Sequence, residues 1–208
     1  MLTKRLVLTA VLMLGIGLSQ AWAMTPAETA NKAAESAAAA ASKAAGLAAD
    51  SHQKLTALEK NIADKQAAIK ALEDGSNPVA LKKAQEELKK LVAIKTDLVK
   101  FVAQLDGAAA QAQTAANAAH EAALRASAQG VTPVDAKAAA NMAVRQAGLA
   151  DSFLSQAVTF TGAMNKWIDE GGFRGLLTPG GTTDTTVKKI PRPGNTPTEI
   201  GHGRRGVL

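Results

Sequence analysis

The fold is decided by one long stretch of the chain, residues 78–129: PVALKKAQEELKKLVAIKTDLVKFVAQLDGAAAQAQTAANAAHEAALRASAQ. Apolar side chains recur in it with heptad spacing, the pattern of a helix packed as in a coiled coil. The seam consists of Leu81, Ala84, Leu88, Leu91, Lys95, Leu98, Val102, Leu105, Ala109, Ala112, Ala116, Ala119, Ala123 and Ala126. Leucine dominates its first half and alanine its second, so the stretch predicts one long helix with a tapering core.

The residues before this stretch carry the same heptad with the opposite gradient of side-chain size. Their seam consists of Ala27, Ala30, Ala34, Ala37, Ala41, Ala44, Ala48, Ser51, Leu55, Leu58, Ile62, Lys65, Ile69 and Leu72. A turn signal, EDGSNP at residues 73–78, separates the two stretches. Folding the chain at this turn sets alanine against alanine and leucine against leucine, which predicts an antiparallel hairpin.

A third helical segment follows, and its small residues also come before its large ones. They are Ala136, Ala139 and Ala143, then Phe153, Ala157, Phe160, Met164 and Trp167. Packed antiparallel to the second helix, this segment matches the same gradient. We therefore predict an all-α fold, an elongated antiparallel three-helix bundle of alanine-rich, coiled-coil-like character over residues 24–171, with helices at about 26–74, 78–129 and 133–170.

Local signals mark the ends of these helices. Thr25-Pro26-Ala27-Glu28 is a capping box with proline at the first helical position, and Thr132-Pro133-Val134-Asp135 nearly repeats it. Gly130 is expected to end the second helix.

Gly46 and Gly107 fall at about the same level of the folded hairpin. Glycine inside a helix costs about 1 kcal/mol relative to alanine. The pair therefore predicts either a bend or a place of tight packing.

The first 23 residues have the pattern of a secretory signal peptide. Lys4 and Arg5 precede an apolar stretch, residues 6–18, and Ala21-Trp22-Ala23 offers small residues for cleavage before Met24. The alternative is an uncleaved anchor, but a spanning helix needs about 20 apolar residues. We expect a periplasmic or secreted protein after cleavage.

The last residues, 172–208, lose the apolar periodicity and are rich in glycine, proline and threonine. They predict a disordered, basic C-terminal tail, for which Phe173, Leu176 and Leu177 are candidate contacts with the bundle. Within the tail, a candidate partner-binding segment consists of Lys188, Lys189, Ile190, Pro191, Arg192 and Pro193, with His202, Arg204 and Arg205 beyond it. The alternative is a terminus without a selected role.

The charge of the chain is placed unevenly. Of the formal net charge of +6 over 208 residues, Lys4 and Arg5 contribute two charges and the tail contributes four, so the helical body is neutral. A neutral, mixed-charge surface does not predict nucleic-acid binding. We expect membrane contact to be peripheral at most, through the basic tail.

No arrangement of residues predicts catalysis, a cofactor or a metal. The chain has no cysteine and three histidines, and His52 and His120 are expected about 30 Å apart along the bundle. The carboxylate pairs Glu73-Asp74, Glu86-Glu87 and Asp169-Glu170 are expected on solvated surface. We interpret the chain as a non-enzyme with no small-molecule substrate.

Lys65 and Lys95 occupy seam positions of the first and second helices. Either their aliphatic stems pack while the amines reach water, or the two charges control the register of the hairpin.

The function expected from these features is that of a helical spacer or adaptor for protein partners in the bacterial envelope, with self-association open. The predicted architecture also resembles the minor pilus-tip subunits of type IV secretion and conjugation systems, which implies an exported three-helix component of such a machine. A second alternative is a periplasmic holdase chaperone, since the predicted hairpin is similar to the long helical hairpins of that class.

Overall fold

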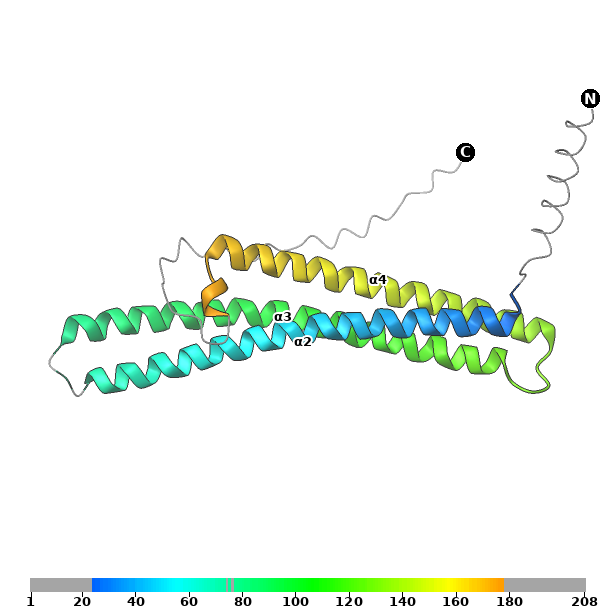
Figure 1. Cartoon of the computed structure of the whole chain (residues 1–208), viewed down its shortest axis with the longest axis horizontal. Coiled ribbons are helices and arrows are strands. Elements are labelled where there is room, and N and C mark those ends of the chain that lie inside the picture. Colours follow the sequence, from blue (N-terminus) through cyan, green and yellow to red (C-terminus); the bar gives the residue numbers. More distant parts are fainter. Residues whose placement is uncertain (1–23, 74, 76, 178–208) are drawn as a thin grey trace, which may run out of the picture. The chain divides into compact units, whose positions relative to one another are not determined.

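A computed structural model describes residues 24–73, 75 and 77–177 of the chain. These residues are 91% helical and contain no strand, and three helices pack against each other. The helices are α2 (Pro26–Glu73), α3 (Pro78–Ala126) and α4 (Pro133–Gly171), and a short 3-10 helix, η1 (Arg174–Leu176), follows them (Figure 1). The predicted all-α, antiparallel three-helix fold is confirmed. The proposed signal peptide and residues 178–208 of the proposed tail lie outside the described residues.

Side-chain caps explain where each helix begins. In α2, the Glu28 carboxylate accepts from the Thr25 backbone N–H at 2.8 Å, and the Thr25 hydroxyl accepts from the Glu28 N–H at 3.2 Å. This is the reciprocal capping box that the sequence predicts. Asn77 caps α3 by accepting from the Ala80 N–H at 3.0 Å.

α4 begins with a variant of the same cap. The Thr132 hydroxyl accepts from the Asp135 N–H at 3.2 Å and donates to the Asp135 carboxylate at 2.6 Å. The residue before the cap, Val131, belongs to the connection from α3, which ends at Ala126 rather than near Gln129. Gly130, with φ of 79°, lies inside that connection, where glycine adopts the left-handed conformation without a steric cost, and does not itself end α3.

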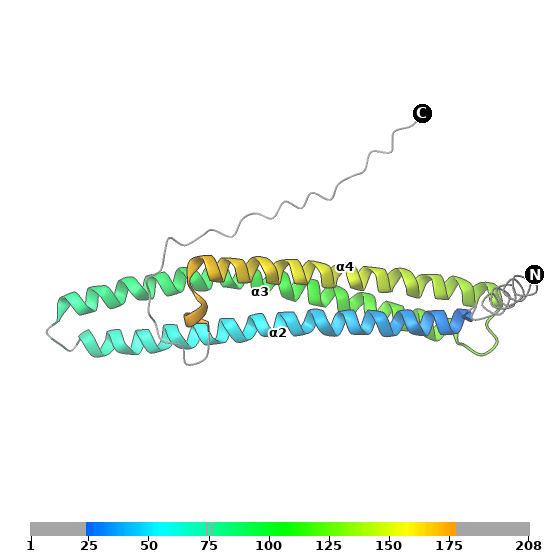
Figure 2. The ribbon, with the colours of Figure 1, turned by 45° about the horizontal axis from the view of Figure 1, so that its top comes forward.

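The chain divides into two compact units, and each of the three helices contributes a segment to both. Unit 1 contains described residues 24–46 and 106–157, and unit 2 contains described residues 47–105 and 158–177, apart from positions 74 and 76. In each unit the segments of α2 and α3 run antiparallel and the segment of α4 runs back along them (Figures 1 and 2).

Unit 1 has a core of one residue type. Every buried side chain among its described residues is alanine, and Ala37, Ala112 and Ala143 are fully buried, one from each helix. Small knobs let helix backbones approach closely, but each removes little apolar surface from water. Helix propensity, in which alanine ranks first, must therefore supply much of the stability of this unit.

Unit 2 buries large side chains instead. Leu58, Leu91, Ile94, Leu98, Leu105 and Met164 are fully buried. An aromatic cluster joins α3 to the end of α4: the ring centroids of Phe101 and Trp167 lie 5.6 Å apart, and those of Trp167 and Phe173 lie 4.8 Å apart. Such contacts stabilise beyond the area that they bury.

The C-terminal end of α4 closes over this cluster. The Gly172 N–H donates to the Asp169 carbonyl at 3.2 Å, and the Phe173 N–H donates to the Ile168 carbonyl at 2.9 Å. With φ of 68° at Gly172, this is a Schellman motif, which turns the chain back onto the bundle. Phe173 is 0% exposed as a result.

The described chain therefore continues in contact with unit 2 past Gly172, where the tail was expected to begin. Leu176 and Leu177 are buried, as is Phe173, so the three candidate contacts of the tail are confirmed. The Asn61 side-chain amide of α2 donates to the Leu176 carbonyl at 2.6 Å and holds η1 in place.

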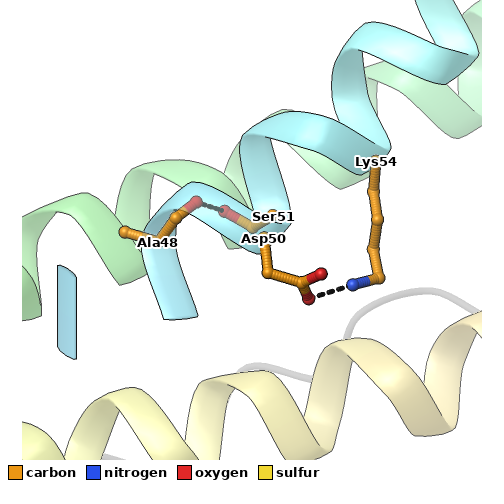
Figure 3. Close-up of polar contacts among 4 residues, drawn as sticks. All are labelled: Ala48, Asp50, Ser51 and Lys54. Carbon is orange, nitrogen blue, oxygen red and sulfur yellow. Dashed lines mark hydrogen bonds and ion pairs between the residues drawn. The ribbon is translucent and has the colours of Figure 1, made fainter. Parts of the chain in front are cut away.

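The heptad seams agree with the structure at every position. None of the seam residues of the three helices is exposed, and most are buried. Ser51, the polar member of the first seam, is 0% exposed, and its hydroxyl donates to the Ala48 carbonyl at 2.6 Å. Figure 3 shows this bond running along α2, while Asp50 and Lys54 form an ion pair one turn apart on the helix surface.

Gly46 and Gly107 do not mark tight packing. A Cβ atom added at either position would have no neighbouring atom within 4 Å. Both glycines lie beside the boundary between the units, which passes between residues 46 and 47 in α2 and between residues 105 and 106 in α3. The predicted bend at these residues stays a prediction.

Candidate partner-binding surfaces

A shallow groove lies between α2 and α3 in unit 1. Its volume is about 500 Å³. The residues that line it are Asn31, Ala34, Glu35, Ala38, Gln113, Ala116, Asn117 and His120. On each helix they follow the spacing i, i+3, i+4, i+7, so one face of α2 and one of α3 form the two walls.

The lining of this groove combines apolar and polar side chains. Methyl groups of Ala34, Ala38 and Ala116 form its apolar part, and the Gln113 amide donates to the Asn117 side-chain oxygen at 2.9 Å.

The histidines lie in different units, as the sequence suggests. His120 lines the groove in unit 1, and Asn31 lines it from the opposite helix. His52 lies in unit 2, on the exposed side of α2, where its carbonyl accepts from the Thr56 hydroxyl at 3.0 Å. Within the described ranges, no group of three or more His, Asp or Glu side chains has an arrangement that could hold a metal ion.

A second surface of unit 1 carries large apolar side chains. On α4, Met142 and Leu149 are each about half exposed and lie seven residues apart, so they share one face of the helix. We call this pair the α4 stripe. Leu124, Val134 and Val144 are further exposed apolar residues of the same unit. In unit 1, therefore, the fully buried side chains are all alanine, whereas these larger apolar side chains are exposed.

Two ion pairs cross from α2 to α3 in unit 2. The Lys65 amine lies 2.7 Å from the Glu87 carboxylate, and both side chains are about 20% exposed. The Lys95 amine lies 2.8 Å from the Glu59 carboxylate in a more exposed setting. Both seam lysines therefore pair with a glutamate across the hairpin, and register control by these charges stays a prediction.

The adjacent carboxylates do not act as pairs in the described residues. Glu87 forms an ion pair with Lys65, while Glu86 lines a surface hollow at the start of α3. Asp169 accepts from the Arg174 guanidinium at 2.7 and 3.1 Å, and Glu170 lies 3.7 Å from Lys166. Asp74, the second member of the remaining pair, is outside the described residues.

The candidate tail residues are not placed by the structure. Lys188, Lys189, Ile190, Pro191, Arg192, Pro193, His202, Arg204 and Arg205 all lie outside the described residues. Of the helices that the structure describes, none has a stretch long and apolar enough to cross a membrane.

Comparison of the chain with protein-family models, with curated proteins and with solved structures gives no significant match. The function proposed below therefore depends on the sequence and the geometry of the described residues alone.

Proposed function

We propose that this chain is a non-enzymatic helical adaptor of the bacterial envelope, exported by its N-terminal signal peptide and acting in the periplasm or outside the cell. Its partner is another protein, which binds to unit 1 on the α4 stripe. The proposed signal peptide, residues 1–23, supports the location, and the surface of unit 1 supports the mode of action.

The observation that carries the proposal is the inverted distribution of side-chain sizes in unit 1. Its described core consists of alanine alone, while Met142 and Leu149 face outward. Burying a leucine or methionine contributes about 1.5–3 kcal/mol, far more than burying an alanine. A partner that covers the α4 stripe would supply the apolar burial that unit 1 lacks internally.

The experiment is affinity capture from the envelope fraction of the native bacterium with the tagged protein. Replacing both members of the stripe, Met142→Ser and Leu149→Ser, is expected to reduce capture of the partner about tenfold or more, because two apolar anchors of an interface are lost. Unfolding measured by circular dichroism should be little changed, since both side chains are already half exposed.

The matched control is the pair Val92→Ser and Val99→Ser on α3 of unit 2. These valines are also seven residues apart and similarly exposed. The proposal predicts that this control keeps full capture. Equal loss in both double variants, or no loss in the stripe variant, would contradict a partner site on α4.

A second copy of the chain is the alternative occupant of the stripe. Light scattering on the wild-type protein and on the stripe variant distinguishes the two cases. If the wild-type protein is a dimer and the Met142→Ser, Leu149→Ser variant is a monomer, the stripe binds a second copy of the chain and not another protein.

A second candidate function is that of a minor pilus-tip-like component of a type IV secretion or conjugation system. It is favoured by the combination of an export signal with a three-helix bundle that continues into a basic C-terminal segment. Deleting the gene in a conjugative donor is the test: a loss of DNA transfer that the wild-type gene restores supports this role, and unchanged transfer excludes it.

A further inference from the structure

The beginning of α3 forms a basic, partly apolar surface that the adaptor role does not use. We define the hairpin tip as residues 77–90 of unit 2. Pro78 opens the helix, and the next residue, Val79, is 79% exposed. A hollow beside Val79 is lined by Pro78, Val79, Lys82, Lys83 and Glu86.

Two lysines, Lys82 and Lys83, lie beside this valine, and two more follow further along the outward side of α3. Lys82 and Lys83 recur two turns later as Lys89 and Lys90, and all four are exposed. The seam residues between them face α2 instead. Because i and i+7 share one face of a helix, the lysines form two parallel rows along the outside of the hairpin tip.

The charge balance of the hairpin tip is positive. It contains four lysines and two glutamates. Within residues 77–90, Glu87 pairs with Lys65 of α2 at 2.7 Å, which leaves Glu86 beside the four amines; Glu73, at the end of α2, is a further exposed carboxylate of unit 2. Among the described residues, no ion pair involves any of these four lysines.

We infer that the hairpin tip is a binding site for anionic phospholipid at a membrane surface. The lysine amines would meet the phosphodiester groups, and Val79 would enter the boundary between headgroups and acyl chains. An exposed apolar residue at the end of a row of lysines is a pattern of peripheral membrane contact, in which each lysine contributes attraction and the apolar group adds burial.

The exposed valine favours lipid over other anionic partners. Nucleic acid would be contacted by the lysines alone, and single-stranded forms are normally held on aromatic side chains, which the hairpin tip does not contain. An acidic protein surface would satisfy the amines but would place no apolar phase at Val79.

The absence of cysteine from the chain allows a local test. We would replace Val79→Cys in the full chain and attach a polarity-sensitive fluorophore. With vesicles of phosphatidylcholine containing about a quarter phosphatidylglycerol, the emission should shift to the blue, because the probe enters the headgroup boundary. Pure phosphatidylcholine vesicles should give no shift.

The matched control is Val134→Cys, labelled in the same way. Val134 also follows a helix-opening proline and is 77% exposed, but it lies in unit 1 and is followed by Asp135 rather than by a lysine cluster. A probe at this position should not shift with either vesicle, even where another part of the chain binds lipid.

The charge dependence completes the test. Replacing Lys82, Lys83, Lys89 and Lys90 by glutamine in the Val79→Cys chain should weaken the response to anionic vesicles about tenfold or more. Replacing Lys32, Lys43, Lys60 and Lys137 by glutamine removes the same charge at exposed positions elsewhere. This change should leave the fluorescence response to anionic vesicles unchanged. Salt at about 1 M, where the Debye length is about 3 Å, should abolish it.

Three results would overturn the inference: no shift at Val79 with anionic vesicles, an equal shift at Val134, or equal weakening by the two sets of lysine replacements. A shift produced by soluble polyglutamate and not by vesicles would identify an acidic protein as the partner and would also overturn it. None of these results bears on the α4 stripe, so this inference and the adaptor role fail independently.

Discussion

Gly171 shows how closely the end of α4 is packed. A Cβ atom added there would lie 2.1 Å from Cε2 and 2.2 Å from Cζ of Phe173, because the aromatic ring lies directly over the glycine. Phe173 in turn contacts Trp167, so the whole aromatic cluster depends on the missing side chain at this position. The sequence pattern places the end of the third helix at about residue 170 but does not predict this contact.

We predict that Gly171→Ala destabilises the protein by about 1–3 kcal/mol, the usual cost of overpacking a closed core. Gly162→Ala in the same helix is the control. Nothing lies within 4 Å of a Cβ atom at Gly162, so this change should stabilise the helix by up to about 1 kcal/mol. Urea unfolding followed by circular dichroism measures both, and equal effects of the two variants would contradict the contact with Phe173.

At the scale of the helices, the heptad pattern predicts most of what the structure contains. Period and side-chain size determine which face of a helix is buried, and therefore every seam position from Ala30 to Trp167 could be read from the sequence. The burial of Phe173 could be anticipated only as a candidate contact, because the Schellman turn at Gly172 reverses the chain and ends the periodicity.

The partner-binding surfaces were harder to predict than the seams. Which face of α2 and α3 stays open in unit 1 depends on where α4 packs, so the groove beside His120 has no signal in a single helix. Ion pairs across the hairpin are also hard to predict, because they depend on how α2 and α3 pack against each other. Lys65 has no acidic residue three or four positions away on its own helix, and Glu87 becomes its partner only in the packed hairpin.

The Lys65–Glu87 pair leads to a prediction of its own. Lys65→Glu places like charges together at a part-buried contact and should cost about 1–3 kcal/mol, as should Glu87→Lys. Combining the two changes restores opposite charges and should recover most of the loss. Thermal unfolding of the wild type, the two single variants and the double variant gives the coupling energy. Additive losses in the double variant would show that the pair does not align the hairpin.

At the scale of the whole molecule, the two units differ in how their cores are filled. Unit 2 is filled by leucine, isoleucine, methionine and aromatic rings, whereas unit 1 is filled by methyl groups. A core of alanine is not an empty core, because the close approach of its helices leaves no space for a larger side chain.

This filling predicts opposite responses to the same substitution. Ala143→Leu, at a fully buried position of α4, should destabilise unit 1 by about 1–3 kcal/mol through overpacking. Ala138→Leu, on the exposed side of the same helix, should change stability by no more than about 0.5 kcal/mol. Chemical denaturation of both variants is the measurement. Stabilisation by Ala143→Leu would mean that the core of unit 1 contains voids.

Amide hydrogen exchange should resolve the two units within single helices. Exchange protection follows the local density of buried apolar contacts. We expect slower exchange around Leu98 and Leu105 in α3 than around Ala112 and Ala119, with the change close to the boundary at residues 105 and 106. Uniform protection along α3 would show that the units open together.

The alanine core of unit 1 also has a consequence for the register of the helices and for the insertions that they tolerate. Successive layers of an all-alanine core are equivalent, so they do not specify which layer of one helix packs against which layer of the next. Shifting one helix by a whole heptad again places alanine against alanine. Alignment must come from the connections between the helices, from the varied large side chains of unit 2 and from ion pairs such as Lys65–Glu87. Adding or removing seven residues at matching places in all three helices should therefore be tolerated. Adding or removing one or two residues would rotate all the following seam residues out of the core.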